Sequence, residues 1–244
     1  MVGDGWRSYT PVTMGPMESG VWFPDEERMP ETKRHLEVRT ALYQALKLAF
    51  ETSAAIGSEQ FLYWDPTDPH QCLAPDVFVR LGVPDYPFRI WKVWEHGAPH
   101  VAVEVISSSD ERDRDWDAKL ARYRKSGILE LVRFDPENPE RALRIWDAVD
   151  GTLVERLGEP HANCRWLPGF WLTIDDPVMG PALRLSRDPE GHDLYLTPAE
   201  HEAASRVAER AVAEQRIREL EGELRRRDHG GTVETSPPLS HPKK

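Results

Sequence analysis

The stretch Val101–Ser107 reads Val-Ala-Val-Glu-Val-Ile-Ser, a short apolar run with one acidic residue in its interior. Successive side chains of a strand point to opposite faces, so the three valines share one face. Glu104 shares the other face with Ala102 and Ile106. A carboxylate inside a buried strand is costly unless another group pairs with it. We therefore expect a β-strand here and a partner for Glu104.

Two other polar residues stand beside strand-like and helix-like segments near this stretch. Upstream, Asp76 follows a proline and opens the run Val-Phe-Val. Downstream, apolar residues recur at i, i+4 and i+7 in the segment 115–125, which predicts a helix that carries Lys119. Two carboxylates and a lysine are the minimum set for metal-assisted phosphodiester hydrolysis. Asp76, Glu104 and Lys119 are therefore the candidate catalytic residues.

The composition is that of an ordinary globular protein. The chain has 244 residues, 39% hydrophobic and 30% charged, which suits one substantial domain plus an appendage. No apolar run approaches the roughly 20 residues of a membrane-spanning helix. The first residues lack the basic head and apolar core of a signal peptide, so we expect no membrane association and a cytoplasmic location. Cys72 and Cys164 lack metal-ligand spacing and are interpreted as packing residues.

The formal net charge is −11, which bears on nucleic-acid binding. Proteins that bind DNA gain most of their affinity by neutralising phosphates, so this charge argues against a broad, non-specific DNA surface. The net charge does not exclude a local basic cleft, because arginines and lysines cluster between residues 112 and 125. Acidic residues interleave with them between 110 and 117, so charge alone does not decide the question.

The sequence divides into five parts. Residues 1–32 are rich in Pro, Gly and acidic groups and lack periodicity, which predicts an irregular arm. Residues 33–175 carry the alternating helix-like and strand-like segments of an α/β domain. A linker is expected over 176–197 and a charged helix over 198–227. The Gly-, Ser- and Pro-rich segment 228–244 predicts a disordered tail.

Within the domain, hydrophobic spacing and turn residues predict the order of the elements. We expect helices over 33–51 and 115–125, with a long loop and one helical turn over 82–99. The expected strands are 59–64, 76–81, 101–107, 128–134, a hairpin over 141–156, and a short strand or edge loop over 167–174. This order predicts an α/β fold in which helices flank a central mixed sheet.

The last helix begins with Thr197 as a cap and Pro198 in the first helical position. Ile217, Leu220 and Leu224 form its one clear apolar seam, at 3- and 4-residue steps. A seam this short does not decide between a coiled coil and a solvated helix packed on the domain. A homodimer through this helix is accordingly one of two interpretations.

The ordered motifs resemble the PD-(D/E)XK nuclease superfamily, and within it the bacterial Uma-two family of restriction endonucleases. The likeness covers roughly residues 33–174. It is carried by Leu-Ala-Pro-Asp-Val-Phe-Val at 73–79, Glu-Val-Ile-Ser at 104–107, Asp-Trp-Asp-Ala-Lys at 115–119 and Gly-Ile at 127–128. The resemblance implies a restriction-endonuclease-like core and a DNA substrate.

The superfamily's usual third motif is Glu-x-Lys, in which the two residues share a strand face. Here Ile106 occupies the lysine position, and Ile supplies neither charge nor proton. In the family resembled, the lysine has migrated to the following helix, where Lys119 occupies the matching place. The resemblance then implies that Asp76, Glu104 and the Val105 carbonyl hold one Mg²⁺, with Mn²⁺ as the alternative ion. Lys119 would orient the attacking water or neutralise charge on the phosphate.

Structural readings compete with each of these assignments. Arg133, on a neighbouring strand, could neutralise Glu104 in a purely structural pair, and Lys119 could bridge to Asp115 on the helix surface. Asp115 itself fits a helix cap or a partner that positions Lys119. His35, in the first turns of the first helix, is expected to be an exposed polar residue.

Three functions remain open on the sequence alone. The first is a metal-dependent endonuclease that hydrolyses DNA. The second is a catalytically weakened nuclease fold that acts as a DNA-binding or protein-interaction module, which the acidic charge and Ile106 favour. The third is a transcription or stress-response partner that dimerises through the C-terminal helix. The Asp76–Glu104 pair favours the first, because neighbouring buried carboxylates repel unless a cation lies between them.

Overall fold

The computed structural model describes residues 32–106, 115–157, 162–177 and 179–230. The chain consists of two compact units, Met1–Thr197 and Pro198–Lys244. The elements of the first unit, in chain order, are α1 (Lys33–Phe50), β1 (Ala54–Gly57), β2 (Phe61–Tyr63), β3 (Cys72–Leu73), β4 (Val77–Leu81), β5 (Ile90–Lys92), α2 (Val93–His96), β6 (Val101–Val105), α3 (Trp116–Ser126), β7 (Glu130–Phe134), η2 (Pro139–Arg141), β8 (Leu143–Val149), β9 (Thr152–Glu155), β10 (Ala162–Asn163), β11 (Phe170–Asp176) and β12 (Gly180–Ser186).

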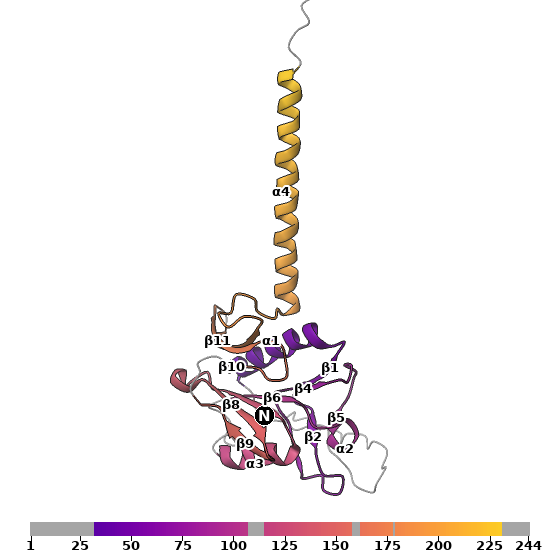
Figure 1. Cartoon of the computed structure of the whole chain (residues 1–244), viewed down its shortest axis with the longest axis vertical. Coiled ribbons are helices and arrows are strands. Elements are labelled where there is room, and N and C mark those ends of the chain that lie inside the picture. Colours follow the sequence, from indigo (N-terminus) through magenta and orange to yellow (C-terminus); the bar gives the residue numbers. More distant parts are fainter. Residues whose placement is uncertain (1–31, 107–114, 158–161, 178, 231–244) are drawn as a thin grey trace, which may run out of the picture. The chain divides into compact units, whose positions relative to one another are not determined.

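A six-stranded mixed sheet in the order β1-β4-β6-β7-β8-β9 forms the centre of this unit (Figure 1). β6 and β7 are parallel and are joined through α3, whereas the other neighbouring strands are antiparallel. A parallel pair needs a long crossover connection, usually a helix, and α3 supplies it. The expected α/β fold with a central mixed sheet is confirmed.

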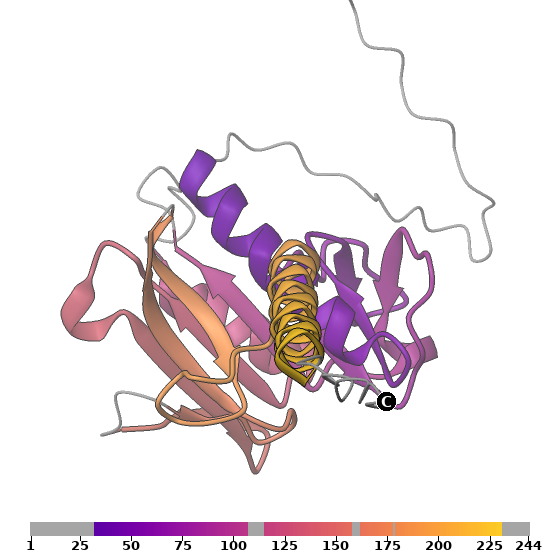
Figure 2. The same cartoon turned by 90° about the horizontal axis from the view of Figure 1, so that it is seen from above.

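The two faces of the sheet are covered by different layers, as the alternation along β6 requires. Val101, Val103 and Val105 face one core, shared with α1 and with the sheet β10-β11-β12. Ala102 faces a second core, shared with Tyr123 of α3 and with the small sheet β3-β2-β5. Figure 2 shows α1 beside the strands of the β10–β12 sheet.

α1 forms because its buried residues recur at helical spacing and its start is capped. Val38, Leu42 and Leu46 are almost fully buried, and the Thr32 side chain accepts a hydrogen bond from the His35 amide at 3.3 Å. The cap fixes the first turn of α1 and therefore the backbone of His35.

The segment 176–197, predicted as a linker, instead contains β12, and this prediction was wrong. β12 pairs with β11 along its whole length, and Leu183 and Leu185 join the core under α1. Arg184 between them is 1% exposed, and its guanidinium donates to the Tyr195 carbonyl at 2.9 Å. The run 183–186 does alternate apolar and polar residues, but Pro181 at the start of β12 weakens the strand signal.

β1 was also absent from the predicted strands. Its four residues follow α1 closely and are small apart from Ile56, so they carry little strand signal. Gly57 is required by packing, because a Cβ there would lie 2.1 Å from the Phe78 ring. The predicted loop over 82–99 contains the helical turn α2 as expected, but also the short strand β5.

The second unit is described over α4 (Pro198–Gly230), a 33-residue helix that the sequence predicted to within three residues of its end. Val207, Val212, Ile217, Leu220 and Leu224 on this helix are exposed. Its surface carries ion pairs three or four residues apart. Of the predicted arm 1–32 and the predicted tail 228–244, residues 1–31 and 231–244 lie outside the described residues, and residues 228–230 belong to α4. Among the described residues, no helix is long and apolar enough to cross a membrane.

Candidate active site

Glu104 lies inside β6 and is only 3% exposed. Both of its carboxylate oxygens are held by α3. The Tyr123 hydroxyl donates to Oε1, and the Lys119 ammonium donates to Oε2 at 2.8 Å. Residues four apart on a helix lie on the same face, so one face of α3 supplies both donors. Glu104 therefore has the partners that a buried carboxylate requires.

The pKa of Glu104 is raised from its ordinary value to about 7. Burial is the largest cause, because desolvation disfavours the charged carboxylate. Lys119 and Tyr123 lower the pKa, whereas the negative charge of Asp76 raises it further. A cation bound between the two carboxylates would offset both the burial and the repulsion, so these residues fit a divalent metal by their donor chemistry.

Asp76 and Glu104 are neighbours because of the register between β4 and β6. The antiparallel pairing reaches Val77 opposite Val103, and just beyond it the Val105 amide donates to Asp76 Oδ2 at 2.7 Å. The two acidic residues singled out in the sequence are therefore close enough, at one end of the sheet, for the charge of Asp76 to raise the pKa of Glu104. Their catalytic and metal-binding roles stay predictions.

Both carboxylate oxygens of Asp76 are held by other elements. The Val105 amide donates to Oδ2 at 2.7 Å, and His35 Nε2 lies 3.0 Å from Oδ1. The Asp76 carbonyl accepts a hydrogen bond from the Ser58 hydroxyl at 2.8 Å, and Arg39 donates to that hydroxyl at 3.1 Å. α1, β6 and the loop after β1 thus fix this residue from three sides.

His35 is the residue of this site that the sequence prediction missed. It was expected to be exposed, but its side chain is 15% exposed and contacts Asp76. The contact joins the first turn of α1 to the start of β4, so no local pattern reveals it. The one sequence signal is the cap Thr32 three residues earlier, which fixes where the first turn lies.

The alternatives for the neighbouring charged residues are decided by their contacts. Arg133 is opposite Glu104 in the register but pairs with Asp135 at 3.2 Å and lies over the Trp116 ring, so it does not neutralise Glu104. Asp115 caps α3, because its side chain accepts a hydrogen bond from the Ala118 amide at 3.0 Å. The predicted role of the Val105 carbonyl as a metal ligand stays a prediction.

A second acidic cluster lies in the turn after β12. Asp188, Glu190 and His192 place ligand atoms within 4.8 Å of one another. The Glu190 and His192 amides both donate to Asp188 Oδ1, at 3.0 and 3.1 Å. Asp188 is thus occupied in shaping the turn, and Glu190 and His192 are exposed. The cluster is explained by local turn structure.

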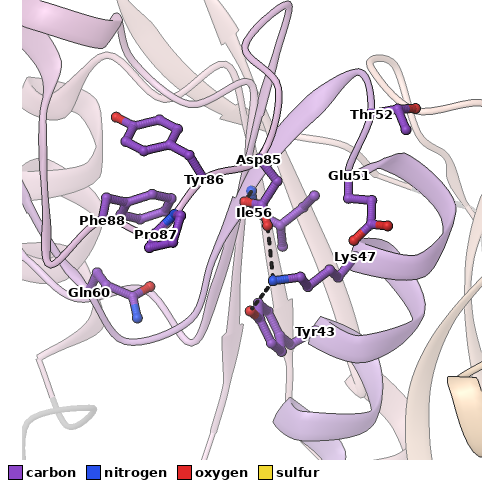
Figure 3. A pocket seen from close by; sticks show the side chains of 10 residues that line it. All are labelled: Tyr43, Lys47, Glu51, Thr52, Ile56, Gln60, Asp85, Tyr86, Pro87 and Phe88. Carbon is purple, nitrogen blue, oxygen red and sulfur yellow. Dashed lines mark hydrogen bonds and ion pairs between the residues drawn. The ribbon is translucent and has the colours of Figure 1, made fainter.

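A hollow of about 480 Å³ lies beside the C-terminal half of α1 (Figure 3). The Lys47 ammonium crosses it, 3.0 Å from Asp85 and 3.4 Å from the Tyr43 hydroxyl. Asp85 also accepts a hydrogen bond from the Ile56 amide at 3.1 Å. These contacts fasten the loop after β4 to α1 and cover the outer edge of β1, which protects an edge strand from pairing with another chain.

A mixed sheet that carries two buried carboxylates at one end, with a lysine from the crossover helix against one of them, is the arrangement of a nuclease-like α/β protein of the PD-(D/E)XK type. The comparisons with known proteins name the family. A family model described as "Uma2: Putative restriction endonuclease" matches residues 26–175, and the chain belongs to this Uma-two family.

A crystal structure described as a "putative nuclease belonging to DUF820", from Anabaena variabilis, resembles the chain with a TM-score of 0.40 and 14% identity. That match covers 66% of this chain and 78% of the other. None of the curated proteins compared with the chain matches it.

Proposed function

We propose that this chain is a metal-dependent endonuclease that hydrolyses DNA phosphodiester bonds, with Asp76, Glu104 and Lys119 as its catalytic residues. One observation carries the proposal: Asp76 and Glu104 are both buried at one end of the sheet, where the Val105 amide holds Asp76 and the Lys119 ammonium lies 2.8 Å from Glu104. The family description supports the nuclease class. DNA as the substrate follows from the resemblance to restriction endonucleases.

The proposed cofactor is Mg²⁺, with Mn²⁺ as the alternative. Asp76, Glu104 and the Val105 carbonyl supply oxygen ligands, which both ions accept. When bound, the cation polarises a phosphoryl oxygen and lowers the pKa of the attacking water. The protein contributes rigidity, because the Val105 amide holds Asp76 and the Tyr123 hydroxyl holds Glu104.

Lys119 takes the role that the usual strand lysine would have. Its side chain is 21% exposed, so the ammonium lies at the boundary between the buried carboxylate and solvent. From that position it neutralises Glu104 in the absence of a substrate. During hydrolysis the same positive charge would orient the attacking water or stabilise charge on the phosphate. The proposal therefore assigns catalysis, rather than folding, as the main role of Lys119.

A plasmid cleavage assay on the full chain tests the proposal. Wild type is expected to cut DNA with Mg²⁺ or Mn²⁺ and to stop when the cation is chelated. Glu104→Gln and Asp76→Asn should abolish cutting, and Lys119→Met should lower it about 10²–10³-fold while cation binding persists. Glu190→Gln, in the exposed turn cluster, is the matched control. Cation-independent cutting, or equal loss in the control, would contradict the assignment.

The second candidate is a weakened nuclease fold that binds DNA or a protein. The observations that favour it are the net charge of −11 and Ile106 at the usual lysine position. It predicts that wild type and Lys119→Met both fail to cut in any cation. DNA retention measured in the same samples then separates a DNA-binding module from a protein-interaction module.

We propose further that α4 forms a homodimer along the seam of Ile217, Leu220 and Leu224. The three side chains are exposed in the single chain, at 55%, 42% and 60%. An isolated helix with an apolar seam gains stability by pairing that seam. Light scattering on the full chain is expected to give twice the monomer mass. Replacing Ile217 and Leu220 with lysine should give the monomer, and an unchanged mass would contradict the pairing.

A further inference from the structure

His35 lies beside the proposed metal ligand Asp76, although it comes from a different layer of the fold. Its Nε2 atom is 3.0 Å from Asp76 Oδ1. Both side chains are mostly withdrawn from solvent, at 15% and 10% exposure. Imidazole is among the commonest metal-binding side chains in proteins, so its position next to a buried carboxylate calls for a chemical account.

The two side chains are positioned independently of each other. The Thr32 cap accepts the His35 amide hydrogen bond and so sets the first turn of α1. The Val105 amide donates to Asp76 Oδ2 and so turns Oδ1 toward α1. Because separate backbone contacts orient each residue, the close approach of the two atoms is built into the fold.

The separation of the two atoms suits a shared cation. In an octahedral shell with ligand distances of about 2.1 Å, two adjacent ligand atoms lie about 3.0 Å apart. Glu104 is held at α3 by Tyr123 and Lys119. Among the described residues, it does not form a group with two other acidic, His or Cys residues whose ligand atoms all lie within 4.8 Å of one another. His35 and Asp76 are therefore the part of the donor set that is already brought together.

We propose that His35 Nε2 is a ligand of the same divalent cation as Asp76, and that the site therefore prefers Mn²⁺ to Mg²⁺. The inference rests on the proposed metal-dependent function and specifies its cofactor. Carboxylates and water bind either ion, but an imidazole nitrogen favours transition metals, and Mg²⁺ strongly prefers oxygen. A nitrogen ligand from α1 thus gives the site a selectivity that the two carboxylates alone do not supply.

The competing account is that the His35 N–H only donates a hydrogen bond to Asp76 and orients it. The two accounts differ in what a bound Mn²⁺ ion touches. A coordinated imidazole produces ¹⁴N modulation in the electron spin echo of Mn²⁺, which changes in a defined way when the protein is labelled with ¹⁵N-histidine. An imidazole that only orients Asp76 is not bonded to the ion, so it does not give the coupling of a direct ligand.

The experiment uses the full chain with Mn²⁺ alone as the probe. Wild type, His35→Ala, His35→Gln and the control His96→Gln are compared, since His96 lies at the Tyr86 hydroxyl and away from Asp76. Wild type and His96→Gln are expected to show the nitrogen coupling, and both His35 variants to lack it. Calorimetry should show Mn²⁺ binding weakened about 10-fold or more in the His35 variants, and Mg²⁺ binding by a smaller factor.

Each other outcome overturns the inference in a recognisable way. Mn²⁺ that binds wild type without nitrogen coupling, or coupling that persists in both His35 variants, shows that His35 is not the ligand. Equal weakening of both ions would leave His35 as a positioning residue for Asp76. Failure of wild type to bind either cation would instead remove the proposed function itself. His35→Gln keeps a side-chain amide, so it serves as the informative variant if His35→Ala does not fold.

Discussion

Replacing Glu104 with glutamine is expected to change the pH dependence of stability, because this carboxylate is held at an energetic cost. The pKa of Glu104 is raised from 4.5 to about 7, mainly by burial. A carboxyl group whose pKa is raised on folding stabilises the native state most below its unfolded pKa. That contribution is lost as the pH rises toward the folded pKa. Wild type should therefore lose stability between pH 5 and pH 8 through this group.

The magnitude follows from the size of the shift. About 2.5 pKa units correspond to roughly 3 kcal/mol, at about 1.4 kcal/mol for each unit. Part of this is already lost at pH 5, so about 2–3 kcal/mol remains between pH 5 and pH 8. Glu104→Gln has no such titration. Its stability relative to wild type should therefore rise by about 2–3 kcal/mol over that interval.

Urea unfolding at the two pH values, without divalent cations, measures this difference. Glu137→Gln, which replaces an exposed glutamate, is the control and should track wild type within about 0.5 kcal/mol. Adding Mg²⁺ or Mn²⁺ at pH 8 should stabilise wild type and the control, but not Glu104→Gln. If the difference in unfolding free energy between Glu104→Gln and wild type stays constant from pH 5 to pH 8, the argument that burial raises the pKa of Glu104 is refuted.

Four further substitutions test the electrostatics at the site and the packing of other parts of the chain. Tyr123→Phe removes a hydrogen-bond donor to Glu104, so the pKa of Glu104 should rise. Calorimetry should then show that Mn²⁺ binding needs a higher pH than in wild type. Arg156→Met should cost about 3–5 kcal/mol in urea unfolding, because it leaves the fully buried Glu130 without its guanidinium partner. Gly57→Ala should cost about 1–3 kcal/mol by overpacking, whereas Gly222→Ala, in open space on α4, should stabilise the helix by up to about 1 kcal/mol in thermal unfolding.

The central strand could be predicted because its signals are local. The alternation along 101–107 gave the strand and its two faces, and the isolated Glu104 required a partner. The period of apolar residues along α3 placed Lys119 on that helix, and the structure sets it against the same carboxylate. These features follow from side-chain periodicity, which the sequence displays directly.

The features that were missed depend on tertiary contacts. β12 was missed because Pro181 weakens its strand signal, and because the burial of Arg184, which donates to the Tyr195 carbonyl, depends on neighbours that the sequence does not display. His35 was misjudged because its partner, Asp76, lies far along the chain, just before β4. Burial of a polar residue depends on what the fold places around it, and a single sequence does not specify that neighbourhood.

The most direct test of the central claim is to locate a bound cation. Anomalous diffraction from crystals of the full chain soaked in Mn²⁺ identifies the ion by its own signal. The account predicts one strong peak at the carboxylates of Asp76 and Glu104, next to His35 and absent in Asp76→Asn. A peak only at the Asp188 turn would contradict a metal-dependent nuclease site. The absence of any peak near β4 and β6 would contradict it as well.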